Sequence, residues 1–189
     1  MRNIWFYADP HLNHEKIIRF CQRPFTDVDN MNEVLITRYN NRVKPSDTVY
    51  ILGDFSWKEH AKFAHRLNGK KTLIMGNHDK MREEDRSAFS RVIGKCPSEY
   101  GILEINDNKQ KIVMCHFPME SWNASFHGSW HLHGHCHGRL PEDVGKLRLD
   151  VGVDVWDYAP VSLDEIRAKM EGKTERWKQY HEHNERVRL

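Results

Sequence analysis

Five short apolar runs in the sequence each end at a group of aspartate, asparagine or histidine residues, and this pattern constrains the fold more than any other feature. Short apolar runs bounded by turn residues and separated by helical segments are typical of buried strands. In open α/β sheets, ligands bind at the carboxyl ends of the strands, so we expect five strand ends to converge on one site. The groups are Asp9-Pro10-His11, Gly53-Asp54, Gly76-Asn77-His78-Asp79, His116-Phe117-Pro118 and Gly134-His135-Cys136-His137-Gly138.

The spacing of apolar and polar residues predicts an α/β domain with mixed sheets covered by helices. Strands and helices alternate in the first part of the chain, and strand follows strand in the later part. We expect one domain over residues 1–163 and a polar helical tail over residues 164–189. Strands are expected at Ile4–Ala8, Thr48–Leu52, Lys71–Met75, Tyr100–Ile105, Lys111–Cys115, Trp130–His133 and Lys146–Val151, and helices at His14–Cys21, Asp29–Val43, Lys58–Leu67, Arg82–Val92 and Leu163–Met170.

The composition excludes several classes of protein. With 29 Lys and Arg against 27 Asp and Glu, the formal charge of +2 gives little electrostatic reason to expect a protein that coats nucleic acid. No apolar run approaches the roughly 18 residues that a membrane span needs, and the N-terminal residues do not read as a signal peptide. The four cysteines form no CxxC pair, so we expect reduced thiols and a cytoplasmic location.

The polar groups contain seven candidate metal ligands. Carboxylates, imidazoles and an amide oxygen suit Mn²⁺, Fe and Zn²⁺, whereas the lack of clustered thiols argues against a structural zinc or iron–sulfur site. Seven ligands are too many for one tetrahedral ion but are enough for two ions that share a carboxylate. Two ions roughly 3.5–4 Å apart can activate a bridging water for phosphoryl displacement. The candidates are Asp9, His11, Asp54, Asn77, His116, His135 and His137.

The ordered set of motifs resembles that of the calcineurin-like metallophosphoesterases, whose pattern is D-x-H, G-D, G-N-H-[DE], H and G-H-x-H. Every motif is present in order between residues 9 and 137. The resemblance implies a four-layer α/β/β/α sandwich with two mixed sheets between helices. It also implies two divalent metal ions and a role for each motif residue: Asp9, His11 and His137 hold the first ion, Asn77, His116 and His135 hold the second, Asp54 bridges both, and His78 is the proton donor or phosphate contact.

The mechanism that follows from this resemblance is a hypothesis. A hydroxide between the two ions attacks phosphorus in line, while the ions neutralise charge on the phosphoryl oxygens. His78 gives a proton to the leaving alkoxide. Asp79 is expected either to hold His78 in orientation or to cap a helix. Asp150 and Asp154 are expected either to accept a hydrogen bond from a ligand imidazole or to form a turn.

Candidate substrate contacts lie in residues 11–25. Arg19 and Arg23 could hold a non-reacting phosphate, since arginine binds phosphate bidentately, but an ordinary basic helix face is the alternative. His14 follows His11 by three residues and would face the site if a helix begins there. In residues 118–130, aromatic side chains are expected either to stack on bases or to form local core.

Two differences from a related class narrow the reaction. Protein Ser/Thr phosphatases of this superfamily carry G-D-x-x-D-R-G and G-N-H-E, whereas here Trp57 replaces the second acid and the other motif ends in Asp79. These differences count against a protein phosphatase. The chain also ends soon after the last motif, which leaves little room for a capping domain and resembles small bacterial or phage-borne phosphodiesterases.

We therefore expect a phosphodiesterase that acts on a small or nucleotide-like substrate. The alternatives are a phosphomonoesterase of nucleotides or sugar phosphates, and a non-catalytic scaffold of the same fold. A nuclease is disfavoured, because tracking a nucleic-acid backbone usually demands a positive groove. We expect two divalent ions, with Mn²⁺ first and Fe, Zn, Co or Ni as alternatives. The sequence leaves the oligomeric state open.

Overall fold

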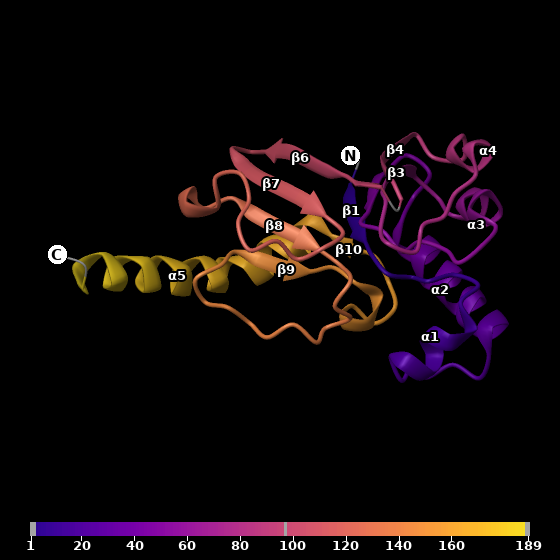
Figure 1. Ribbon diagram of the computed structural model, residues 1–189, viewed down its shortest axis with the longest axis horizontal. Coiled ribbons are helices and arrows are strands. Elements are labelled where there is room, and N and C mark those ends of the chain that lie inside the picture. Colours follow the sequence, from indigo (N-terminus) through magenta and orange to yellow (C-terminus); the bar gives the residue numbers. More distant parts are fainter. Residues whose placement is uncertain (1–2, 97, 188–189) are drawn as a thin grey trace.

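Two β-sheets pack face to face in the computed structural model, which describes residues 3–96 and 98–187 (Figure 1). In the first sheet, β1 to β4 run parallel and an antiparallel strand closes each edge. Its order is β10 (Val161–Ser162), β1 (Ile4–Tyr7), β2 (Thr48–Ile51), β3 (Lys70–Ile74), β4 (Arg91–Lys95) and β5 (Glu99–Tyr100).

The second sheet is also mixed. Its order is β6 (Ile102–Asp107), β7 (Gln110–Cys115), β8 (Trp130–His133) and β9 (Arg148–Asp150). β6 pairs antiparallel with β7, and the other two pairs are parallel. The expected α/β class with two mixed sheets is therefore confirmed.

Alternate residues of the central strands point into two different cores, as the two-residue period of a strand requires. Tyr7 and Val49 face the helix-side core, where the Tyr7 ring lies 5.2 Å from that of Tyr39 on α2. Phe6 and Leu52 face the inter-sheet core and pack with apolar side chains of the second sheet. The helix-side core joins the first sheet to α1 (Glu15–Phe20), α2 (Val28–Arg42) and α3 (His60–Arg66).

The C-terminal helix α5 (Leu163–Val187) contributes to the inter-sheet core, and its far end projects beyond the sheets (Figure 1). Leu163, Ile166 and Met170 are buried there. The helix therefore starts in the core and continues as the expected polar tail. The division at residue 163 stays a prediction, and residues 188–189 of the expected tail lie outside the described part of the chain.

The structure corrects one predicted helix. Instead of a helix over residues 82–92, it has the single turn α4 (Glu83–Arg86) followed by strand β4, in which Val92 pairs with Leu73 of β3. Pairing in a sheet overrides local helical preference when β-branched residues lie beside a parallel neighbour. Within residues 3–96 and 98–187, no helix combines the length and the apolar character that a membrane crossing requires.

The role of α5 in the core can be tested with two neighbouring substitutions. Met170→Ala should lower the free energy of unfolding by about 2–5 kcal/mol, because it leaves a cavity in a packed core. Glu171→Ala, on the exposed side of the same helix turn, should change it by less than about 0.5 kcal/mol. Urea unfolding measures both. Equal effects of the two substitutions would show that the helix is only a solvated appendage.

Candidate metal centre

The loops that follow β1, β2, β3, β7 and β8 meet at one place. The loops after β1 and β2 are joined by backbone hydrogen bonds from Asp9 N to Gly53 O (3.1 Å) and from His11 N to Asp54 O (3.0 Å). The backbone N–H of His135 donates to Asp9 Oδ2 at 2.8 Å, which joins the loop after β8 to the loop after β1. The polar groups that follow these five strands in the sequence therefore lie close together in the structure.

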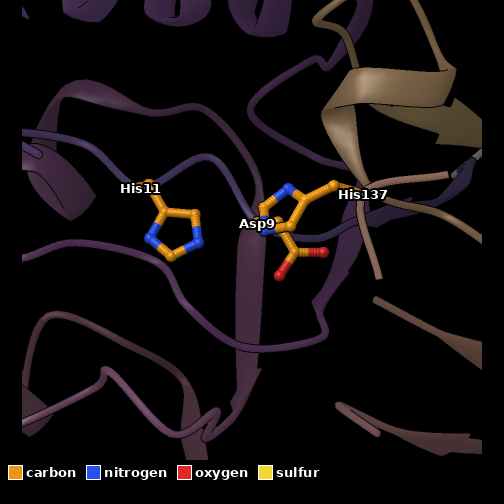
Figure 2. A group of neighbouring side chains, drawn as sticks. All are labelled: Asp9, His11 and His137. Carbon is orange, nitrogen blue, oxygen red and sulfur yellow. The ribbon is translucent and has the colours of Figure 1, made fainter. Parts of the chain in front are cut away.

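Asp9, His11 and His137 form the first cluster of metal-ligand atoms. One ligand atom from each lies within 4.8 Å of the others. Figure 2 shows the Asp9 carboxylate and the two imidazole rings gathered around a common space. Asp9 Oδ1 and His11 Nε2 are buried and have no hydrogen-bond partner among the described residues. Because an unsatisfied buried polar atom is costly, these two atoms are suited to coordinate a cation.

Asp54, His116 and His135 form a second cluster with the same spacing. Asn77 belongs beside it, because Asn77 Oδ1 lies 3.0 Å from His116 Nε2. Asp54 Oδ2 lies 3.4 Å from His11 Nε2 and 3.5 Å from His116 Nε2, so this carboxylate stands between the two clusters. The seven predicted ligands are thus brought together in the two expected groups, with Asp54 at the shared position.

Left-handed backbone is concentrated among these residues. A positive φ is uncommon for a residue with a side chain and costs of order 1–3 kcal/mol, so such residues mark sites where the surrounding structure enforces a geometry. Five of the seven predicted ligands adopt it: Asp9 (54°), His11 (49°), Asp54 (50°), His135 (70°) and His137 (49°).

At two motif positions, only glycine leaves room for a neighbouring carboxylate. A Cβ at Gly134 would lie 2.3 Å from Asp9 Oδ2, and a Cβ at Gly76 would lie 2.3 Å from Asp54 Oδ1. Any side chain at these positions would displace a carboxylate of the site. The glycines therefore allow the loops to pass directly against Asp9 and Asp54.

Burial and neighbouring charges set the protonation of the metal-free site. Burial raises the pKa of Asp9 well above its ordinary value, and burial together with Asp79 raises the pKa of Asp54 to about 7. Burial lowers the pKa of His116 to about 4, so this imidazole is neutral. Burial acts to lower the pKa of His137, but the hydrogen bond to Asp154, together with Cys21 and Asp9, outweighs burial and raises this pKa to about 10.

The Nδ1 atoms of two predicted ligand histidines are held by hydrogen bonds. His137 Nδ1 lies 2.7 Å from Asp154 Oδ2, and His116 Nδ1 lies 2.9 Å from the carbonyl oxygen of Leu52. Such contacts fix the orientation of the ring and leave Nε2 for an ion. Asp154 thus accepts from an imidazole, whereas Asp150 accepts from the backbone N–H of Gly152 in a turn.

Arg23 lies behind the first cluster and is buried. Its Nε and Nη2 donate to the two oxygen atoms of Asp154 at 2.8 Å each, and its guanidinium also donates to the carbonyl oxygens of Asp9 and Pro10. The side chain considered for substrate binding is therefore fully engaged in holding Asp154. Arg19 is exposed on α1 and is not among the residues that line the pocket described below.

A pocket of about 600 Å³ opens beside the two clusters. His14 lies in its wall, with its ring stacked on the indole of Trp57 at 4.5 Å and its Nδ1 3.3 Å from His11 Nδ1. The ring of His78 lies 5.5 Å from that of His11. The lining residues are His11, Asn13, His14, Glu15, Lys16, Ile17, Phe20, Asp54, Trp57, His78, His135 and His137.

Asp79 holds two loops of the site together through hydrogen bonds to their backbone. It is buried and accepts hydrogen bonds of 2.8 Å from the backbone N–H groups of Asp54, Phe55 and Gly76. His60 Nε2, also buried, lies 3.4 Å from Asp79 Oδ1. These contacts go to the loop backbone and to His60 rather than to the imidazole of His78. Nothing in the sequence around His60 distinguishes it from the other polar residues of its helix, so its role was not predictable.

Comparison with known proteins shows which sequences this chain resembles. A sequence model described as calcineurin-like phosphoesterase matches residues 2–156. An uncharacterized protein of Methanocaldococcus jannaschii is 37% identical over 176 residues, covering 88% of this chain and 90% of its own length. The Gene 66 protein of Mycobacterium phage L5 is 28% identical and covers 88% of this chain and 93% of its own length.

A solved structure shares the fold. The crystal structure of a protein of unknown function from Aquifex aeolicus superposes with a TM-score of 0.68 at 24% sequence identity. The match covers 89% of this chain and 99% of the other chain. At this identity the likeness extends to the fold alone.

The protonation of the metal-free site predicts that metal binding releases protons. At pH 7 His137 is protonated, because its pKa is about 10, and Asp54 is partly protonated, because its pKa is about 7. Ions bind the deprotonated ligands, so affinity for Mn²⁺ should rise as the pH rises from 6 to 8. Calorimetry in buffers of different ionisation enthalpy measures the released protons. Asp154→Asn should reduce the release, and heats that do not depend on the buffer would contradict the assignment.

Proposed function

The chain belongs to the calcineurin-like phosphoesterase family of metal-dependent hydrolases, and on that premise we propose that it is a phosphodiesterase that works with two divalent ions. The observation that carries the proposal is the position of Asp54 between the two ligand clusters. A carboxylate shared in this way suits a pair of ions in one site. The complete set of ligands argues against a scaffold that has lost catalysis.

The donor set fits two such ions. Asp9, His11 and His137 would hold one ion and Asn77, His116 and His135 the other, with Asp54 between them. The unpartnered Asp9 Oδ1 and His11 Nε2 support this reading, because each is a buried polar atom without a hydrogen-bond partner. Oxygen and nitrogen donors of this kind accept several first-row metals, so we take Mn²⁺ as the first choice, with Fe, Zn, Co and Ni as alternatives.

The protein residues then have defined tasks in the reaction. When bound, the two ions lower the pKa of a coordinated water and neutralise charge on the phosphoryl group. His78 lines the same pocket, and from there its ring can give a proton to the leaving oxygen. The backbone N–H of His78 donates to Asp54 Oδ1 at 2.9 Å, which ties the proton donor to the shared carboxylate. Asp79 holds the backbone of both loops in place.

The charge of the pocket favours a diester over a monoester. Among the described residues that line it, Lys16 is the one lysine or arginine. Arg23 is bound to Asp154 and therefore cannot clamp a second phosphoryl oxygen. A phosphodiester carries one negative charge and a monoester carries up to two at neutral pH. Apart from the two ions, the pocket offers few cationic side chains for the second charge of a monoester, and this supports the diester.

We also propose that the enzyme acts in the cytoplasm on small or nucleotide-like substrates. The four cysteines are free, which is consistent with a reducing compartment. The formal charge of +2 is too close to balance to favour tracking along a long nucleic acid.

The proposal is tested by hydrolysis assays with Mn²⁺. These compare a diester with a monoester, and an alkoxide leaving group with p-nitrophenolate. The wild type should hydrolyse bis(p-nitrophenyl) phosphate faster than p-nitrophenyl phosphate, and Asp54→Ala should abolish this activity. His78→Ala should lower turnover of a diester with an alkoxide leaving group by about 10²-fold or more, because this leaving group needs a proton. The same variant should affect p-nitrophenyl esters much less, because p-nitrophenolate leaves without one.

His65→Ala is the control, since this histidine is exposed on α3, outside the pocket lining. It should leave both rates unchanged. Full activity and metal content in Asp54→Ala would overturn the two-ion scheme. A much faster monoester rate in the wild type would reverse the choice of substrate class.

A further inference from the structure

Two large aromatic side chains are exposed in the pocket that also contains the candidate metal ligands. Trp57 is 44% exposed and Phe20 is 62% exposed, and both line this pocket. Trp57 comes from the loop after β2, and Phe20 is the last residue of α1. Exposed aromatic surface inside a concave site is typical of ligand binding, because it is costly to leave in water.

The indole of Trp57 is held in a fixed position. The imidazole of His14 stacks on it with an angle of 10° between the ring planes, and His14 Nδ1 lies 3.3 Å from His11 Nδ1. The backbone N–H of Trp57 donates to the carbonyl oxygen of Leu12 at 2.9 Å. With one side of the ring covered by His14, the exposed part of the indole is a ready stacking surface.

This surface lies next to the residue expected to donate a proton. The ring centroids of Trp57 and His78 are 5.7 Å apart. The carbonyl oxygen of Phe20, which lines the same pocket, accepts a hydrogen bond from Arg139, two residues after His137. Trp57 and Phe20 therefore each belong or bond to a segment that carries candidate metal ligands. A group bound against these two side chains would be close to the scissile phosphate.

The chemistry of the walls selects a planar group with polar edges. Ile17, Phe20 and Trp57 provide apolar surface, while Asn13, Glu15 and Lys16 provide polar groups at the same pocket. An acyl chain would place its methylene groups against these polar side chains. A nucleobase presents flat faces to the aromatic rings and hydrogen-bonding edges to the polar residues. A volume of about 600 Å³ is in the range of pockets for ligands of nucleotide size.

We propose that this pocket is a nucleobase subsite in which Trp57 is the stacking platform and Phe20 is a second apolar wall. The inference rests on the proposed function, because the base is bound as part of the phosphoester. It makes Trp57 a specificity-determining residue. The residue that separates this sequence from the protein phosphatase motif thus has a positive role in selecting the substrate.

The test compares two ligands that differ only in the base. AMP and ribose 5-phosphate are measured as competitive inhibitors of bis(p-nitrophenyl) phosphate hydrolysis by the Mn²⁺-loaded protein. Stacking of one base on an aromatic side chain should make AMP bind about tenfold or more tightly than ribose 5-phosphate. Trp57→Ala should reduce this ratio to less than about threefold, whereas Trp57→Phe should retain part of it because a ring remains.

Phe20→Ala should lower the ratio to an intermediate value, and Phe126→Ala is the matched control. Phe126 is also exposed, at 73%, but it lines a different pocket beside α5, so its substitution should leave the ratio unchanged. A wild-type ratio near one, or a ratio that survives Trp57→Ala, would overturn the inference. Because the ratio is internal to each variant, a general loss of activity does not affect it.

The failure of the proposed function is distinguishable from the failure of this inference. If the protein hydrolyses no phosphoester with any of the five metals, the proposed function fails, and the same ratio is then measured as dissociation constants by calorimetry. If bis(p-nitrophenyl) phosphate is hydrolysed but AMP and ribose 5-phosphate inhibit equally, only the nucleobase subsite fails.

Discussion

The buried carboxylate of Asp54 is the constraint on which the rest of the site depends. Its Oδ2 lies within 3.5 Å of both His11 Nε2 and His116 Nε2, and its Oδ1 accepts the backbone N–H of His78. Burial raises its pKa to about 7, because a charge in this position is unfavourable without a positive partner. Two ions on either side of this carboxylate would supply that partner and would stabilise the charged form.

The fold stabilises a geometry that these loops would not adopt alone. Asp9, His11 and Asp54 lie in left-handed backbone, which is unfavourable for residues with side chains. Asp79 helps to offset this cost by accepting three backbone hydrogen bonds from two loops. Arg23 helps as well, because it connects Asp154 to the carbonyl oxygens of the loop after β1. The parallel strands bring the loops to one edge, and these two buried charged residues lock them there.

The sequence predicted the residues that sit at strand ends but not the residues that support them. Asp9 and Asp54 were identifiable because the carboxyl ends of parallel strands meet at one edge, whatever the details of the loops. The roles of His60 and Arg23 depend on contacts between segments distant in sequence, Asp79 for one and Asp154 for the other, and local pattern cannot reveal these. The strand β4 was missed for the same reason, since its identity comes from pairing with β3.

Asp54 is proposed to join two ions in one centre, and electron paramagnetic resonance of the Mn²⁺-loaded protein is the direct test of this proposal. Two ions that share a carboxylate and lie a few ångströms apart are magnetically coupled. We expect two Mn²⁺ per chain with a coupled spectrum in the wild type, and loss of the coupling in Asp54→Asn. A single ion per chain, or two ions with uncoupled spectra in the wild type, would contradict it.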